Sequence, residues 1–471
     1  MMKIVSGLFD HMVLQRNGTN VSEACLEGLS THNGPVLVTV RKKGKPFAAW
    51  RETKIGQAKN GRFTAGLKGL PTGGPYDIEL LIGKDSLLVR DVLVGDVWLL
   101  GGQSNMQGYG HFPIKEKLPA NSQVRALFMD DVWREAKDPL HNMWKCVDQV
   151  HIALSGGTHP LKHPSWRGVG PGPAFGQEMF RLSGQTPQGL IACAHGGTSM
   201  SQWDPELKKA GSQSLYGALL RRFHKIGGKV AGLIWYQGCS DVSDAEATPL
   251  YTRRMKQFIA ALRRDCGAPR LPVAIVQISR VIRAGQEMAP RWNSIQDQQR
   301  RLSDLIPNLT CVPSIDVPPV DGIHVGGHGQ NILGRRLARA MMALKKGRRF
   351  GFPPISIKQV TLGVVRDART VFVEFAHLQG PLCSSGRPSG FQVVTSKSED
   401  NVCDIVLDGK RAIIRTAMGV DASKDGVLEW ESAVLHYGYG TNPYCNITDG
   451  EGRPVPVFGP IRIGLPKISI R

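Results

Sequence analysis

Residues 92–108 read VLVGDVWLLGGQSNMQG, an apolar run that passes directly into a glycine-rich turn. An apolar run without polar alternation predicts a strand that is buried on both faces, as in a parallel sheet. Four further apolar runs follow along the chain, and between them apolar residues recur at helical spacing, for example from Tyr251 to Leu262. We therefore expect an α/β domain over residues 91–350, with a mainly parallel sheet. The later runs are GLIACA (189–194), VAGLIWY (230–236), LPVAIVQIS (271–279) and CVPSID (311–316).

The two ends of the chain have a different pattern. Residues 1–90 contain short alternating segments such as VLVTV (36–40) and YDIELLI (76–82), separated by Gly-Pro turns. Residues 351–471 return to this pattern, with TVFVEF (370–375) as an example. Short alternating segments between turns are typical of antiparallel β structure. The sequence predicts an N-terminal β domain (1–90) and a C-terminal β domain (351–471) around the α/β domain.

The composition is that of a folded protein with an excess of basic residues. Of 471 residues, 41% are hydrophobic and 21% charged, and the formal net charge is +20. The densest basic runs, RKKGK (41–45) and KKGRR (345–349), are short and lack interleaved aromatic residues, so we interpret them as solvated faces and expect no nucleic-acid site. The nine cysteines form no CxxC pair, and we expect no metal and no cofactor.

The apolar stretches and the start of the chain bear on location and partners. It shows neither an apolar stretch long enough for a bilayer nor a signal-peptide pattern at its start, so we expect no membrane insertion. The expected location is the cytoplasm, or a phage particle that acts at a cell surface. A homo-oligomer or a larger assembly remains open.

Ser104 lies in the glycine-flanked turn that follows the first buried run. A turn of this kind exposes a hydroxyl and leaves backbone N–H groups available for an oxyanion. A serine in such a turn is more often a turn or capping residue, so a catalytic role requires a base.

The best candidate for the base is His324 in DGIHVGGHGQ (321–330), three residues after Asp321. A carboxylate at this spacing can hold one ring nitrogen while the other accepts the serine proton. His328 lacks an acidic residue at the same spacing. His195, in AHGGTSM (194–200), is a second alternative, and we expect it to line the pocket.

Several blocks together resemble the sialate O-acetylesterase family of SGNH hydrolases. They are GDVWLLGGQSNMQG (95–108), CAHGGTSMSQWDP (193–205), GLIWYQGCSD (232–241), WNSIQDQQRRL (292–302) and DGIHVGGHGQNILGRRLA (321–338), with LFDHMVLQR (8–16) and LHYGYGTNPYCNITDGEGRPVPVFG (435–459) near the ends. The resemblance covers nearly the whole chain. It implies a three-layer α/β/α SGNH domain and release of O-acetyl groups from a carbohydrate through an acetyl-enzyme.

The resemblance also implies roles for individual residues. Ser104 matches the nucleophile, and Asp321 with His324 matches the Asp-x-x-His pair. Gly197 and Gln237 are expected to join the backbone N–H of Ser104 in the oxyanion hole, although a structural hydrogen bond is an almost equal alternative for Gln237. Expected substrate-binding residues are Trp203, Asp204, Asn105 and His195, with Trp203 stacking on a sugar or, equally, serving as a core residue.

One position departs from the family pattern. The third block of the family usually reads Gln-Gly-Glu-Ser, and here Cys239 replaces the glutamate. The alternative function is therefore a weak or inactive carbohydrate-binding or structural module on the same scaffold. A lipid, thioester or peptide ester as substrate is the other alternative, because fold and triad do not select a substrate.

Overall fold

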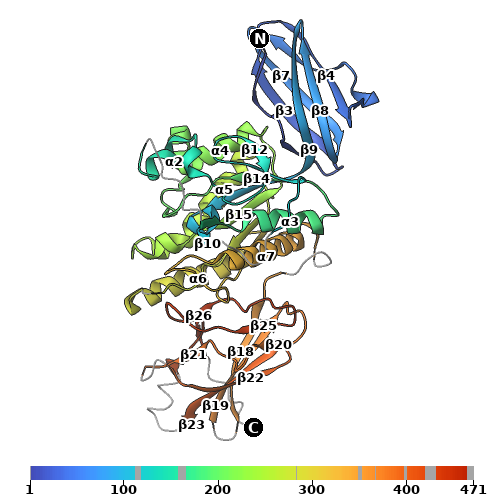
Figure 1. Cartoon of the computed structure of the whole chain (residues 1–471). Coiled ribbons are helices and arrows are strands. Elements are labelled where there is room, and N and C mark those ends of the chain that lie inside the picture. The colour runs from blue at the N-terminus through green and yellow to red at the C-terminus, as the bar shows by residue number, and fades with distance from the viewer. Residues whose placement is uncertain are drawn as a thin grey trace.

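The computed structural model describes residues 2–111, 118–157, 166–282, 284–347, 353–365, 368–396, 400–419 and 431–463. Figure 1 shows an N-terminal β part, a central α/β part and a C-terminal β part in succession along the molecule. The strands of the N-terminal part are β1 (Lys3–Ser6), β2 (Val13–Gln15), β3 (Val21–Leu29), β4 (Gly34–Lys42), β5 (Lys45–Pro46), β6 (Thr53–Lys59), β7 (Arg62–Pro71) and β8 (Gly73–Ile82).

Strand β9 (Asp85–Gly102) joins the N-terminal part to the α/β part. Its first half pairs antiparallel with β8, and its second half pairs in parallel with β14 (Gln188–Ala192) and β15 (Gly232–Tyr236). From Val92 to its end, every residue of β9 is buried, which explains the continuous apolar run. The expected boundary between residues 90 and 91 falls inside this strand.

The central sheet runs in the order β12, β11, β14, β9, β15, β16, β17. All neighbours in this order pair in parallel except β11 and β12, which pair antiparallel. The expected α/β fold is confirmed. The sheet as a whole has 15 strands and is mixed, because β9 carries the antiparallel N-terminal strands. The remaining strands are β11 (Val124–Leu127), β12 (Trp133–Glu135), β14 (Gln188–Ala192), β15 (Gly232–Tyr236), β16 (Val273–Val276) and β17 (Leu309–Val312).

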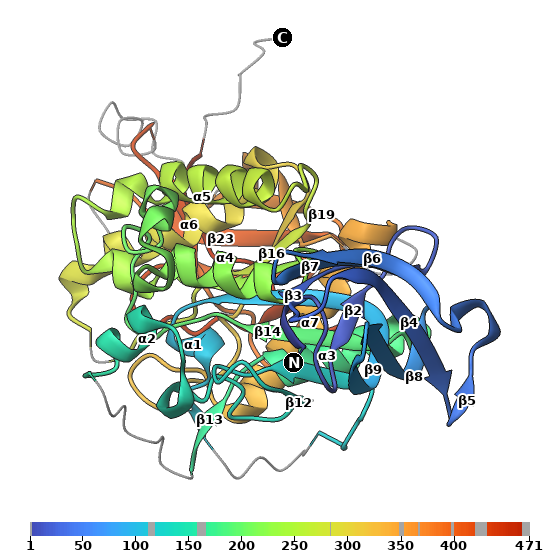
Figure 2. The same cartoon turned by 90° about the horizontal axis from the view of Figure 1, so that it is seen from above.

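Helices lie on both faces of the central strands (Figure 2). Trp98 of β9 meets Phe175 of α3 edge to face, with ring centroids 5.3 Å apart. Trp235 of β15 packs on Phe258 of α5 at 4.6 Å. These contacts bury large aromatic surfaces between the layers. The helices are α1 (Ser104–Gln107), α2 (Gln149–Leu154), α3 (Gly172–Leu182), α4 (Leu215–Lys225), α5 (Tyr251–Asp265), α6 (Ala289–Leu305) and α7 (Gly327–Lys346).

The C-terminal part has its own apolar core. It contains a four-stranded antiparallel sheet, a three-stranded sheet and a strand pair. Gln277 fixes it to the α/β part, because its side-chain amide donates to the carbonyl of Val457 and accepts from the N–H of the same residue. The strands are β18 (Ser356–Val365), β19 (Ala368–Ala376), β20 (Leu382–Ser384), β21 (Phe391–Val394), β22 (Val402–Asp408), β23 (Arg411–Gly419), β24 (Val434–Tyr437), β25 (Ile447–Asp449) and β26 (Phe458–Arg462).

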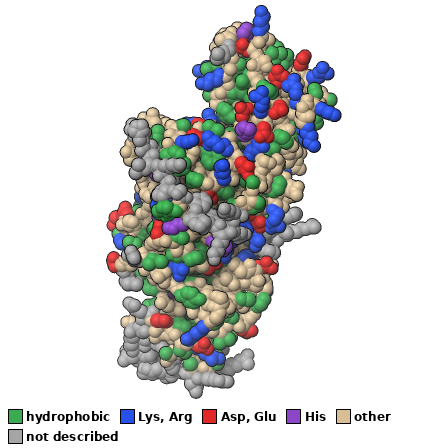
Figure 3. All heavy atoms as spheres, viewed as in Figure 1, with side chains coloured by type: hydrophobic (Ala, Val, Ile, Leu, Met, Phe, Trp, Pro, Cys, Tyr) green, Lys and Arg blue, Asp and Glu red, His purple; other side chains and the backbone are tan. Residues whose placement is uncertain are grey.

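Basic side chains are scattered among acidic ones on the face that Figure 3 shows. The lysines of the 41–45 run are exposed, as expected. Lys345 is exposed as well, although its ammonium group lies 4.7 Å from the ring centroid of Trp98 and 3.8 Å from a carboxylate oxygen of Asp96. Residues 348 and 349 of the second run lie outside the described residues. No helix in the described ranges has both the length and the apolar composition of a bilayer span.

Gly102, the last residue of β9, has a backbone that suits glycine. Its φ is +132°, and a Cβ there would lie 2.2 Å from the carbonyl oxygen of Tyr236. A side chain would therefore separate β9 from β15 at the point where the Ser104 turn begins.

We predict that Gly102→Ala lowers the free energy of unfolding by about 2 kcal/mol or more, because it combines backbone strain with a steric clash. Urea unfolding measures this change. Gly18→Ala is the control, because a Cβ at Gly18 meets nothing within 4 Å, and it should stay within about 0.5 kcal/mol of wild type. Equal stability of the two variants would contradict the tight packing at Gly102.

Candidate active site

Ser104 begins α1 immediately after β9 and is 7% exposed. The turn before it is fixed by Gln103, whose N–H donates to the carbonyl of Tyr236 over 2.8 Å. The side-chain oxygen of Gln103 also accepts the N–H groups of Gly238 and Ser240. The turn that carries Ser104 is therefore fastened to the segment after the neighbouring strand β15.

Asn105 connects the Ser104 turn to the segment that holds His324. Its Oδ1 accepts the N–H of Val325 over 2.9 Å, and its Nδ2 donates to the carbonyl of Ile323 over 3.4 Å. Its Oδ1 also accepts a hydrogen bond from Gln330. The residues on both sides of His324 are thus hydrogen-bonded to the residue that follows Ser104.

Asp321 and His324 form the contact that their spacing predicted. Asp321 Oδ2 lies 2.7 Å from Nδ1 of His324, and Oδ1 accepts the backbone N–H groups of Ile323 and His324. Burial alone would raise the pKa of Asp321, but these hydrogen bonds outweigh it and hold the pKa below its usual value. The carboxylate therefore stays charged and orients the imidazole.

A second glycine loop approaches Ser104 from the end of β14. The N–H of Gly196 donates to Oε1 of Gln107 over 2.7 Å, and a Cβ at Gly196 would lie 3.4 Å from Cβ of Ser104. Gly197 has φ +70° and open space where a side chain would be. Within the described part of the chain, no acceptor is hydrogen-bonded to the backbone N–H of Ser104 or Gly197.

The side-chain amide of Gln237 is already engaged in other hydrogen bonds in the structure. Its side-chain Nε2 donates to the carbonyl of Thr198 and to Oδ2 of Asp241, which uses both amide hydrogens. Its main-chain carbonyl accepts from Tyr251 and Gln299. This environment matches the structural alternative, in which Gln237 holds the glycine loop in place.

Three of the expected substrate-binding residues, Trp203, Asp204 and Asn105, differ in their exposure and contacts. Trp203 is 0% exposed and packs on Trp235, so it serves as a core residue and cannot stack on a sugar. Asp204 is exposed and caps the following turn by accepting the N–H of Glu206. Asn105 is buried and is hydrogen-bonded to the segment that holds His324.

His195 is also buried, and its ring is directed toward α2. Its Nδ1 lies 3.1 Å from Nδ1 of His151, and the two rings stack. Burial lowers the pKa of His195 to about 4 and that of His141, nearby, to about 3. These histidines are neutral at pH 7. His328, the other alternative base, is exposed on the first turn of α7.

Tyr109 is a site residue that sequence reasoning missed. Its ring stacks on the His324 ring, with centroids 4.4 Å apart and an interplanar angle of 27°. The signal was available, since Tyr109 lies five residues after Ser104, directly after the block that contains it. Among the described residues, no group of three or more His, Cys, Asp or Glu side chains is arranged to hold a metal ion.

The region that carries these residues matches a known family. Residues 94–343 match the family model described as carbohydrate esterase, sialic acid-specific acetylesterase. The chain belongs to this family. It is therefore a carboxylic ester hydrolase of the carbohydrate esterase type.

Individual relatives agree with this assignment. The chain is 30% identical over 266 residues to the "Probable carbohydrate esterase" of Arabidopsis thaliana, covering 52% of this chain and 90% of that protein. It is 25% identical to human sialate O-acetylesterase over 51% of this chain, and spans about half of the human protein, 49%. A carbohydrate acetylesterase structure from Xanthomonas citri has the same fold, with TM-score 0.69, 22% identity, and 97% of this chain and 99% of that chain covered.

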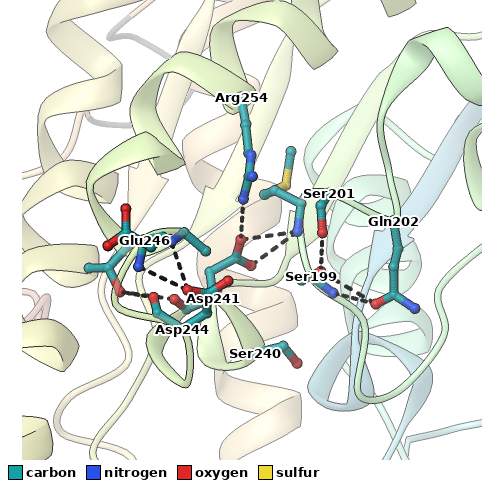
Figure 4. A network of polar contacts seen from close by, with 12 residues as sticks. Ser199, Ser201, Gln202, Ser240, Asp241, Asp244, Glu246 and Arg254 are labelled. Carbon is teal, nitrogen blue, oxygen red and sulfur yellow. Dashed lines mark hydrogen bonds and ion pairs between the residues drawn. The ribbon is translucent and has the colours of Figure 1, made fainter.

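Cys239 is the residue that departs from the pattern expected from the resemblance. Its thiol is buried, and burial raises its pKa to about 12, so it supplies no negative charge. A carboxylate is nevertheless present two residues later. Asp241 accepts the N–H of Met200 through both oxygens, at 3.1 Å each. The carboxylate lies 3.9 Å from Arg254, and Figure 4 shows the two side chains directed toward each other. Asp241 thus joins the two loops that follow β14 and β15.

The lowered pKa of the buried His195 predicts how the stability of this esterase depends on pH. In the unfolded chain, His195 takes up a proton below about pH 6.5, but the folded protein does so only near pH 4. The unfolded state therefore binds more protons between these values, and stability falls as the pH is lowered through this window.

We expect the free energy of unfolding, measured in urea at pH 7.5 and pH 4.5, to drop more in wild type than in His195→Gln, which cannot be protonated. An equal drop in both proteins would show that His195 is not the group that resists protonation.

Proposed function

We propose that this esterase removes O-acetyl groups from a carbohydrate through an acetyl-enzyme on Ser104, with His324 as base and Asp321 as its orienting partner. The observation that carries the proposal is the Asp321–His324 contact of 2.7 Å, held beside the Ser104 turn by Asn105. Because Asp321 occupies Nδ1, the Nε2 atom of His324 is the one that can accept the serine proton.

The reaction has two steps. In the first, Oγ of Ser104 attacks the acetyl carbonyl while His324 takes the hydroxyl proton, and the same imidazolium then protonates the departing sugar oxygen. In the second, His324 activates water, which attacks the acetyl-serine and releases acetate. The serine chemistry needs no metal or organic cofactor.

The oxyanion of each tetrahedral intermediate needs preorganised donors. The backbone N–H groups of Ser104 and Gly197 are the candidates, since no described residue accepts either of them. Gln107 contributes indirectly, because its bond to Gly196 holds the glycine loop beside the nucleophile. Gln237 and Asp241 hold the same loop through hydrogen bonds to the backbone of Thr198 and Met200.

The stack of Tyr109 on His324 restricts the plane of the imidazole. Together with the Asp321 contact, it limits rotation of the ring and keeps Nε2 directed to one place. Preorganisation of this kind lowers the reorganisation needed in the transition state. The acetyl group is small, which fits a nucleophile that is 7% exposed.

We predict that Ser104→Ala and His324→Ala each lower the turnover of 4-nitrophenyl acetate and of an acetylated saccharide by roughly a thousandfold or more, because triad members act as a unit. The matched control is His328→Ala, an exposed histidine four residues from His324, which should retain most of the activity. Acetate release and thermal unfolding are measured for each variant.

Activity of Ser104→Ala within tenfold of wild type, with normal unfolding, would contradict the nucleophile. Greater loss in His328→Ala than in His324→Ala would contradict the base. A wild-type protein that binds saccharides and releases no acetate would favour the alternative of an inactive carbohydrate-binding module.

A further inference from the structure

Beyond the proposed catalytic residues, a row of packed side chains runs from His324 to the surface. We call this row, formed by His324, Tyr109, Arg167, Trp166 and His111, the ladder. Tyr109 stacks on His324, and the guanidinium carbon of Arg167 lies 4.4 Å from the Tyr109 ring centroid. The same carbon lies 5.7 Å from the ring of Trp166. Finally, the Trp166 ring meets His111 edge to face at 4.7 Å.

A short ribbon of backbone holds this ladder. Strand β10 (Gly110–His111) follows Tyr109 and pairs antiparallel with β13 (Arg167–Val169), so that His111 lies opposite Arg167. The ribbon packs against the start of α7, because a Cβ at Gly110 would lie 2.9 Å from the N–H nitrogen of Gly327. The ladder is therefore positioned by the same helix whose preceding segment carries His324.

Trp166 is unusual among the tryptophans of this protein. Its relative exposure is 50%, and it is the one exposed tryptophan among the described residues. A large ring that faces water keeps an apolar surface available, and the hydrogens on the face of a pyranose can cover such a surface. Arg167 and His111 contact the ring and limit its motion, so less side-chain entropy is lost on binding.

The position of Trp166 indicates which sugar it contacts. The acetyl group must reach Ser104, beside His324, whereas Trp166 is separated from the imidazole by both Tyr109 and Arg167. A ring seated on Trp166 is therefore farther from the reacting ester than the sugar that carries the ester.

We propose that Trp166 forms a subsite for a neighbouring sugar ring of the substrate, so that the enzyme prefers acetylated oligosaccharides or polysaccharides to acetylated monosaccharides. This inference rests on the proposed function, because it assigns a substrate class to the same site. The residue proposed to stack on a sugar is therefore the exposed Trp166, which lies on the ladder that begins at His324, and not the buried Trp203.

The test compares three variants with wild type on substrates of increasing length. The substrates are 4-nitrophenyl acetate and the monoacetates of a mono-, di- and trisaccharide of one sugar. That sugar is the one that wild type deacetylates fastest in a panel of acetylated xylose and sialic acid compounds. The variants are Trp166→Ala, Trp166→Phe and Tyr444→Ala, the last being a control at another exposed aromatic residue, 62% exposed, in the C-terminal part.

We expect Trp166→Ala to lower kcat/KM for the di- and trisaccharide acetates by about tenfold, corresponding to the loss of one stacking contact. Turnover of 4-nitrophenyl acetate and of the monosaccharide acetate should stay within about twofold. Trp166→Phe should recover part of the loss, because it keeps an aromatic face, and Tyr444→Ala should behave as wild type.

Two results would overturn the inference while leaving the esterase assignment intact. One is a wild-type kcat/KM that does not rise with saccharide length, and the other is an equal effect of Trp166→Ala on all substrates. Wild-type protein that hydrolyses 4-nitrophenyl acetate and none of the saccharide acetates would instead contradict the carbohydrate substrate of the proposed function.

Discussion

The positions of the Ser104 turn and of the glycine loop beside it depend on the pairing of β9 with β14 on one side and β15 on the other. This strand is buried from Val92 onward, so its backbone groups must find partners inside the protein. Parallel neighbours on both sides supply them, and all three strands then end at the same edge of the sheet. The loops after these ends carry Ser104, Gly197 and Gln237, which is why residues far apart in the sequence meet there.

At this edge, side-chain amides hold the loops in place. Gln103 binds the segment after β15, Asn105 binds the His324 segment, and Gln107 binds Gly196. These three residues alternate along the turn that contains Ser104, and each one satisfies a backbone N–H that would otherwise need water. Because a buried N–H without a partner is costly, the amides stabilise one arrangement of the loops and keep the site ready for reaction.

Features with a local signature could be predicted from the sequence. Apolar runs predicted the buried strands, and the three-residue spacing of Asp321 and His324 predicted a contact that a single turn can make. The Ser104 turn was recognised because it directly follows β9. In contrast, the sequence did not predict that β9 extends back into the N-terminal part. The pairing partner of a strand is not encoded in the strand's own alternation of apolar and polar residues.

Features that depend on burial or on tertiary packing could not be predicted. For Trp203, the sequence left sugar stacking and a place in the core as equal alternatives, since a tryptophan after a glycine loop has the same sequence whether it faces the core or water. For Gln237, the deciding fact was the position of Asp241 and Thr198, which only the fold reveals. Tyr109 and Trp166 reach the same ladder from segments more than fifty residues apart.

The central claim is that acetyl transfer passes through Ser104, and a rapid-quench experiment tests it most directly. An activated ester such as 4-nitrophenyl acetate acylates quickly, so the acetyl-enzyme accumulates before water removes it. After an acid quench in the first turnover, peptide mass spectrometry should find one acetyl group on the peptide that contains Ser104, and none in Ser104→Ala. Hydrolysis at the normal rate with no acetylated peptide, or with the acetyl group on another residue, would contradict the account.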